Sequence, residues 1–113
     1  MDESKRPWGQ YFILDEGENF KVKRIEVKPG GRLSYQYHHK RSEVWTVVCG
    51  VARITLDDAT KDYSIGEVVE IPQGVKHRVE NAERELLTFI EVQYGTYFGE
   101  DDIVRIEDDY QRS

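Results

Sequence analysis

Short runs of alternating apolar and polar residues, separated by turn-forming residues, extend over most of this chain. In residues 51–56, for example, Ala52 and Ile54 alternate with Arg53 and Thr55, which is typical of a strand with one solvated face. Turn signals recur roughly every 8 to 12 residues, and no long helical period appears. The pattern therefore predicts an all-β sandwich or barrel.

The predicted strands are short and closely spaced. They cover residues 11–14, 20–27, 33–39, 43–48, 51–56, 63–65, 67–71, 77–80 and 86–94. The two strands that flank Cys49-Gly50 are expected to form a tight hairpin. The alternation slips between Val22 and Ile25, which predicts a bulge in that strand.

The length of 113 residues fits one domain. We expect an N-terminal arm at residues 1–9, a barrel over about residues 10–95 and a C-terminal tail at residues 96–113. Within the tail, residues 99–103 are expected to form a single helical turn, and residues 107–109 to be solvated. A domain of this size buries roughly two thirds of its unfolded surface, so folding requires neither a disulfide nor a structural metal.

Charge and composition exclude several classes of function. The net charge of −6 argues against a general nucleic-acid binder, which carries a basic face, but it leaves room for a locally basic pocket. The single Cys49 cannot form an internal disulfide, as expected in a reducing cytoplasm. No apolar run approaches the ~20 residues that span a bilayer, and the N-terminus lacks the apolar segment of a signal peptide. We therefore expect a soluble cytoplasmic protein without nucleic-acid or membrane partners.

Two of the three histidines, one amide and one carboxylate lie where the predicted strands can aim them at a common point. Gln36 and His38 share a strand face, Glu43 begins a new strand after a turn, and His77 follows the corner Pro72-x-Gly74. This set suits Zn first, with Mn, Fe, Co or Ni as alternatives, and is unlike the all-oxygen sets of Ca and Mg. The alternative is that each histidine is an ordinary hydrogen-bonded residue of a strand.

The spacing of these residues extends over two longer motifs. They read Gly30-(x5)-Gln36-x-His38-(x4)-Glu43-(x6)-Gly50 and Gly66-(x5)-Pro72-x-Gly74-(x2)-His77-(x3)-Asn81. The motifs resemble those of the cupin family, with glutamine in place of the first histidine of many cupins. The resemblance implies a single-domain cupin fold, which is a double-stranded β-helix or jelly-roll barrel, and a metal bound by Gln36, His38, Glu43 and His77.

A narrower resemblance covers nearly the whole chain. Its segments include Arg6-Pro7-Trp8-Gly9, His38-His39, Arg41, Trp45, Glu91-Val92-Gln93 and Gly99-Glu100-Asp101-Asp102-Ile103-Val104-Arg105. They resemble the C-terminal cupin domain of type II mannose-6-phosphate isomerases, which are often fused to a mannose-1-phosphate guanylyltransferase. The resemblance implies a metal-dependent isomerase that interconverts mannose 6-phosphate and fructose 6-phosphate through an enediolate. Because a guanylyltransferase domain would need some hundreds of residues upstream, we expect a free-standing isomerase without nucleotidyl transfer.

Two positions depart from the family. Lys40 and Val44 stand where it typically has histidine. Val44 should alternate away from Glu43 and leave the metal set intact, whereas Lys40 lies in the turn near the pocket mouth. These departures leave the exact sugar substrate open.

An aldose–ketose isomerase needs cations for the phosphate, a base between C1 and C2, and a group that stabilises the enediolate. Arg41, which lies in the turn between two predicted ligands and matches the family motif, is the first candidate for the phosphate or the enediolate. Glu91 shares the phase of the apolar residues before it and is a candidate base, with an outward-facing charge as the equal alternative. His39 has a suitable pKa but alternates away from His38. The other phosphate candidates, each equally a possible surface charge, are Lys23, Lys76 and Arg78.

Two other classes of function stay open, a small metal-dependent oxygenase and a sugar-binding module without turnover. Fold alone does not decide among them, because cupins host many functions. Oxygenase cupins generally use three histidines or a facial triad, so Gln36 argues against that class. Tyr35 and Tyr37 alternate to the face opposite Gln36, so we expect them to pack outside the pocket, with a homodimer contact as one place for them.

Overall fold

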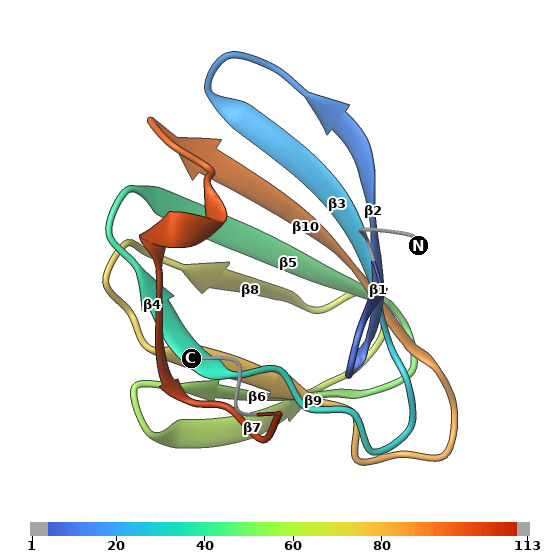
Figure 1. Ribbon diagram of the computed structural model, residues 1–113. Coiled ribbons are helices and arrows are strands. Elements are labelled where there is room, and N and C mark those ends of the chain that lie inside the picture. Colours follow the sequence, from blue (N-terminus) through green and yellow to red (C-terminus); the bar gives the residue numbers. More distant parts are fainter. Residues whose placement is uncertain (1–4, 111–113) are drawn as a thin grey trace.

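Figure 1 shows the computed structural model, which describes residues 5–110 of the chain. Within that range the chain forms eleven strands and one short 3-10 helix. In order they are β1 (Lys5–Arg6), β2 (Gly9–Glu16), β3 (Phe20–Val27), β4 (Tyr35–His38), β5 (Arg41–Cys49), β6 (Ala52–Leu56), β7 (Ala59–Tyr63), β8 (Val68–Ile71), β9 (His77–Glu80), β10 (Leu87–Gly95), η1 (Glu100–Asp102) and β11 (Ile103–Glu107). Residues 1–4 of the predicted arm and residues 111–113 of the predicted tail lie outside the described residues.

The strands form two antiparallel sheets that face each other (Figure 1). One sheet has six strands in the order β1-β2-β3-β10-β5-β8, and the other has five in the order β11-β4-β9-β6-β7. Neighbours in each sheet are mostly distant in sequence, as expected when a chain passes back and forth between two sheets of a jelly roll. The prediction of an all-β, jelly-roll fold is confirmed.

The inward face of the six-stranded sheet changes from apolar to polar along its central strands. On β10, Leu87 and Phe89 are buried in the core, and the next two inward residues are Glu91 and Gln93, which are buried as well. Each fully buried apolar side chain of this size contributes ~1.5–3 kcal/mol to folding, whereas a buried polar group costs free energy unless it is hydrogen bonded. The apolar end therefore holds the sheets together, and the polar end is where a site can form.

The hairpin predicted at Cys49-Gly50 is wrong. Strand β5 belongs to the six-stranded sheet and β6 to the five-stranded sheet, so Cys49-Gly50 carries the chain from one sheet to the other. The tight hairpin is the next one along the chain, between β6 and β7, where Asp57 and Asp58 have φ of 45° and 72°. Alternation identifies strands but not their partners, and two adjacent strands are as readily split between sheets as paired.

Two further predictions need adjustment. The bulge lies on β2, between Ile13 and Asp15, and the slip in alternation seen around Val22 marks the partner strand opposite it. The predicted helical turn is present as η1, and Glu107 and Asp109 are exposed as expected, but the tail is also tied to the rest of the molecule. It forms β11, which pairs with β4, and beyond it Asp109 accepts two hydrogen bonds from Arg32 at 2.7 and 2.6 Å.

Tyr35 packs outside the pocket, as expected, but it is buried in the molecule and not at an outer contact. Its hydroxyl donates to Asp58 at 2.7 Å, and the Arg78 guanidinium lies 5.8 Å from its ring centroid. The homodimer stays a prediction. Within residues 5–110, no helix has the length and apolar character needed to cross a membrane.

Candidate metal and anion site

Three of the four predicted metal ligands converge at the polar end of the barrel. His38 ends β4, Glu43 lies near the start of β5, and His77 begins β9, so both sheets contribute. One donor atom from each lies within 4.8 Å of the others, and all three side chains are buried. Donor atoms about 2.0–2.2 Å from a shared ion are separated by at most roughly twice that distance. The arrangement therefore fits one divalent metal after a small adjustment.

The fourth predicted ligand, Gln36, lies beside this group. It pairs with His77 across β4 and β9, and it lines the same cavity as the three convergent side chains. Its amide oxygen is a neutral donor of the kind that completes a mixed nitrogen and oxygen set.

The histidines are held in the form that binds metal. Nδ1 of His77 lies 3.0 Å from the Val75 carbonyl oxygen, which can only accept, so Nδ1 carries the hydrogen and Nε2 keeps its lone pair. Burial lowers the pKa of His77, and burial together with the nearby positive charge of Arg41 lowers the pKa of His38 to about 2. Both rings are therefore neutral at physiological pH, as coordination requires.

Arg41 is the first residue of β5 and not part of a turn as expected, and it lies inside this group of ligands. Its side chain is 5% exposed. Its Nε–H donates to Oε2 of Glu43 at 3.0 Å, its Nη2 lies 2.8 Å from Nε2 of His38, and its Nη1 donates to the Phe98 carbonyl at 3.3 Å. A guanidinium has no acceptor, so Nε2 of His38 accepts. Arg41 thus uses the lone pairs that a metal would also use on His38 and Glu43.

Glu91 belongs to the same buried network. The Trp45 indole N–H is shared between Glu43 at 2.9 Å and Glu91 at 3.1 Å, and the Gln93 amide donates to Glu91 at 2.8 Å. Burial first, and then the charge of Glu43, raise the pKa of the Glu91 carboxyl. Two carboxyl groups this close and this dry disfavour a second negative charge, so Glu91 is the member that holds a proton near neutrality.

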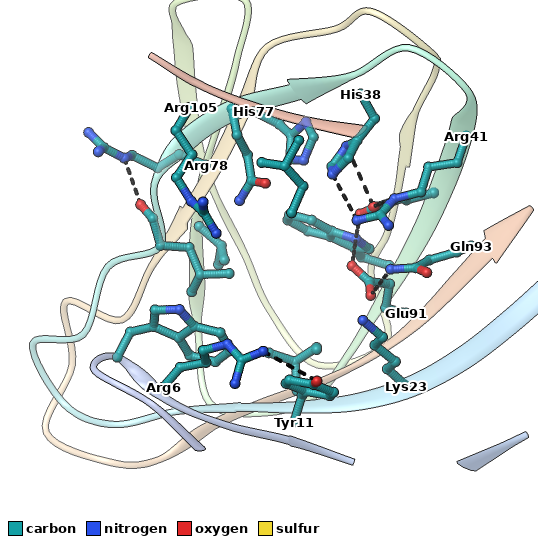
Figure 2. A pocket seen from close by; sticks show the side chains of 18 residues that line it. Arg6, Tyr11, Lys23, His38, Arg41, His77, Arg78, Glu91, Gln93 and Arg105 are labelled. Carbon is teal, nitrogen blue, oxygen red and sulfur yellow. Dashed lines mark hydrogen bonds and ion pairs between the residues drawn. The ribbon is translucent and has the colours of Figure 1, made fainter. Parts of the chain in front are cut away.

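The cavity that contains these groups has a volume of about 70 Å³ and opens to solvent. Figure 2 shows His38, His77 and Arg41 on one side of it and Arg6, Tyr11 and Lys23 on the other. The cations that line it are Arg6, Lys23, Arg41, Arg78 and Arg105. A protein with a net charge of −6 thus concentrates positive charge in one cavity, which favours an anionic ligand.

The structure brings only some of the other predicted residues to this cavity. Lys23 and Glu91 line it. Arg78 also lines it, but its guanidinium donates to the Leu33 carbonyl at 3.0 Å and to Glu107 at 3.4 Å, so it binds the C-terminal segment. Lys76 and His39 are exposed and do not line the cavity.

The two departures from the family also lie outside the cavity lining. The Lys40 ammonium lies 5.1 Å from the ring centroid of Tyr97, and Lys40 itself is exposed. Val44 is half-buried and is cross-strand partner to Val92 and Glu70, on the face opposite Glu43. Neither position alters the group of donor atoms.

Besides the mainly apolar part of the lining, the cavity has four polar residues that were not candidates from the sequence: Arg6, Tyr11, Gln93 and Arg105. Gln93 could have been found, because it continues the inward phase of Glu91 on the same strand. Arg105 could not, because its place depends on the pairing of β11 with β4, where it stands opposite Gln36. Arg6 and Tyr11 belong to strands at the edge of the six-stranded sheet, and only the curvature of that sheet brings them over the cavity.

Comparison with known proteins gives the family. The model of the family described as "Mannose-6-phosphate isomerase C-terminal" matches residues 1–108. The chain belongs to this family. It is 51% identical over 108 residues to the xanthan biosynthesis protein XanB of Xanthomonas campestris pv. campestris, covering 96% of this chain and 23% of that protein. It is 50% identical to the mannose-1-phosphate guanylyltransferase of Salmonella montevideo and to the alginate biosynthesis protein AlgA of Pseudomonas aeruginosa, covering 23% and 22% of those proteins.

Solved structures confirm the cupin fold. The cupin domain of Schizosaccharomyces pombe Cnp3 matches 76% of this chain and 64% of its own with a TM-score of 0.73 and 15% identity. The S161A mutant of Bacillus subtilis oxalate decarboxylase OxdC matches 94% of this chain and 30% of its own with a TM-score of 0.78 and 22% identity. At these identities the likeness concerns the fold alone.

The comparisons overturn the expectation that this chain is a mannose-6-phosphate isomerase. Relatives about half identical to it are named for guanylyl transfer and for xanthan or alginate biosynthesis, and isomerisation is in none of the names quoted above. The isomerase name belongs to the description of the shared domain. The chain spans less than a quarter of the length of these curated relatives, so their activity is not read directly onto it.

Proposed function

We propose that this chain is a metal-binding cupin module that binds a mannose phosphate in polysaccharide biosynthesis. The observation that carries the proposal is the convergence of His38, Glu43 and His77, with donor atoms within 4.8 Å, in a cavity lined by cations. Isomerisation is not part of the proposal. The family and the names of the relatives support the choice of ligand.

Gln36, His38, Glu43 and His77 would hold the metal, with Zn as the first choice and Mn, Fe, Co or Ni as alternatives. The donor set supports a borderline first-row ion, because two neutral imidazoles accompany only one carboxylate. Bound there, the ion would act as a Lewis acid toward sugar oxygens. Arg41 would give up its bonds to His38 and Glu43 and turn toward the anionic ligand, which its planar fork can bind through two hydrogen bonds.

The anionic part of the ligand is supported by the charges of the cavity. Within residues 5–110, the ion pairs of Arg41 and Arg78 are with Glu43, Glu107 and Asp109, whereas Lys23 points into the cavity beside Tyr11. Buried or half-buried cations are costly unless a counter-charge is present. A phosphorylated sugar supplies both that charge and the hydroxyl oxygens that a metal binds.

Metal analysis and calorimetry test this function. The purified protein is analysed for bound metal, loaded with Zn²⁺, and titrated with mannose 1-phosphate, mannose 6-phosphate and mannose. We expect about one metal per chain and tighter binding of a mannose phosphate than of mannose. A protein that takes up no divalent metal, or that binds neither phosphate, would contradict the proposal. His77→Ala is the test variant, and we expect it to lose the binding of Zn²⁺ and of the mannose phosphate together.

A further inference from the structure

A second cluster lies across the cavity from the metal donors, on the first three strands of the six-stranded sheet. Arg6 is on β1, Tyr11 on β2 and Lys23 on β3. The Arg6 guanidinium lies 4.9 Å from the Tyr11 ring centroid and the Lys23 ammonium lies 4.5 Å from it, so two cations share one aromatic ring. We propose that Arg6, Tyr11 and Lys23 form a phosphate subsite that binds the phosphomonoester of the ligand while the metal binds its sugar oxygens.

The donors of this cluster suit a phosphate. Arg6 donates from Nη2 to the Tyr11 hydroxyl at 3.3 Å and from Nη1 to the Lys5 carbonyl at 2.9 Å, and the Tyr11 hydrogen stays able to donate (Figure 2). A guanidinium, an ammonium and a hydroxyl together match the several acceptor oxygens of a phosphate dianion. All three residues are half-buried, so their interactions with an anion are screened less than at an open surface.

Lys23 forms no ion pair among residues 5–110, although its charge interacts with that of Glu91. Glu91 is the cross-strand partner of Lys23, but it accepts hydrogen bonds from Trp45 at 3.1 Å and Gln93 at 2.8 Å. Lys23 therefore contributes a positive charge to the cavity that an anionic ligand can use.

The distance between the phosphate cluster and the metal donors suits a small phosphorylated sugar. One row of cross-strand partners runs over β3, β10 and β5 and consists of Lys23, Glu91 and Trp45. Glu43 lies two residues before Trp45 on β5 and therefore faces the same side of the sheet. Strands are ~4.8 Å apart, so the backbone of Lys23 lies roughly 10 Å from that of Trp45. Their side chains extend into the cavity from both ends, and a phosphorylated hexose can bridge the gap between them.

This inference rests on the proposed function, and calorimetry on the Zn²⁺-loaded full chain separates the two. Lys23→Gln and Arg6→Gln are each expected to weaken binding of mannose 1-phosphate or mannose 6-phosphate, and of inorganic phosphate, by about tenfold. Neither should change the affinity for Zn²⁺. Lys61→Gln removes an exposed ammonium on β7, outside the cavity lining, and is the charge-matched control that should change nothing.

The possible outcomes have distinct meanings. If the parent binds a mannose phosphate and both variants bind it equally well, the subsite is wrong and the proposed function stands. If the parent binds no phosphorylated sugar, the subsite and the proposed function are both wrong. Tighter binding of a nucleoside-diphosphate mannose than of either monoester would overturn the assignment to a monoester. Since Arg6→Gln could also disturb β1, Lys23→Gln, whose backbone bonds are unaffected, decides in that case, and a thermal melt of each variant verifies its fold.

Discussion

Nη2 of Arg41 lies 2.8 Å from Nε2 of His38, deep in the cavity, and the same guanidinium bonds Glu43. The permanent cation of Arg41 and the proposed metal ion would thus depend on the same two donor residues. They can both be present only if Arg41 moves. Its neighbour on the other side, the Phe98 carbonyl, is a weaker partner at 3.3 Å, and the cavity offers room in which the guanidinium can meet an anion.

Replacing Arg41 by Gln should therefore strengthen metal binding. The change removes a positive charge close to the ion and frees Nε2 of His38. Unit charges 4 Å apart interact by about 4 kcal/mol at an effective dielectric constant of 20, and part of that repulsion is relieved when Arg41 moves. We expect the Kd for Zn²⁺, measured by competition with a chromophoric chelator, to fall about tenfold. Arg53→Gln, at an exposed ion pair with Asp62, is the control, and an unchanged Kd for the Arg41 variant would refute the competition.

The barrel should stay folded without metal. Its core is a continuous cluster of buried apolar residues, and a domain of this size supplies its own stability. Chelation with EDTA is expected to lower the melting temperature only by the free energy of the lost binding, with a single cooperative transition in circular dichroism. Unfolding at room temperature on chelation would contradict this expectation.

His77→Ala also tests whether the barrel folds without metal. The His77 ring stacks on His38 at 5.1 Å between centroids and contacts the edge of Trp45, so its removal leaves a cavity. We expect a loss of about 2–4 kcal/mol in unfolding free energy and of Zn²⁺ binding, with the fold retained. Urea denaturation and metal titration of the same sample measure both effects.

Glu91 should make the metal-free protein less stable as pH rises. Its folded pKa is raised to about 8 from an ordinary value of 4.5, because burial and Glu43 disfavour its charge. The folded state therefore binds more protons than the unfolded state between these values, and stability falls as pH rises from about 4.5 to about 8. The Glu91→Gln variant lacks this carboxyl group, so the fall in stability that it causes is absent. With chelator present, we expect the variant to gain about 1–2 kcal/mol on the parent between pH 5 and pH 8 in urea denaturation. A difference that is constant with pH would show that Glu91 is not protonated in the fold.

The sequence predicted the metal donors better than the rest of the cavity, and the reason is geometric. His38, Glu43 and His77 each stand next to a turn or corner of fixed shape, so local spacing carries their positions. Lys23 and Glu91 face inward because of strand phase, whereas the sequence alone left an outward-facing charge equally open for both. Arg105 and Arg6 reach the cavity through the pairing of β11 and through the curvature of the first strands, and these depend on contacts between distant segments. Arg41 was expected in a turn, whereas it begins β5 and is buried.

The chain crosses between the two sheets at Gly50, where we expect an alanine substitution to be costly. Gly66 is the matched control for that substitution. Both glycines have a positive φ, 82° and 88°, which costs about 1–2 kcal/mol for any L residue with a Cβ. They differ in their surroundings. A Cβ at Gly50 would lie 2.8 Å from the Leu86 carbonyl oxygen and 3.2 Å from the Leu87 Cα, whereas a Cβ at Gly66 would meet nothing within 4 Å.

Gly66→Ala should therefore lose only the conformational term, about 1 kcal/mol of unfolding free energy. Gly50→Ala should lose about 2–4 kcal/mol, because the backbone of residues 86–87 must also shift, and Leu87 is buried in the core. Urea denaturation of the two variants beside the parent gives both values. Equal losses would mean that the close approach at Gly50 imposes no cost, and that the chain could turn between the sheets there with an ordinary residue.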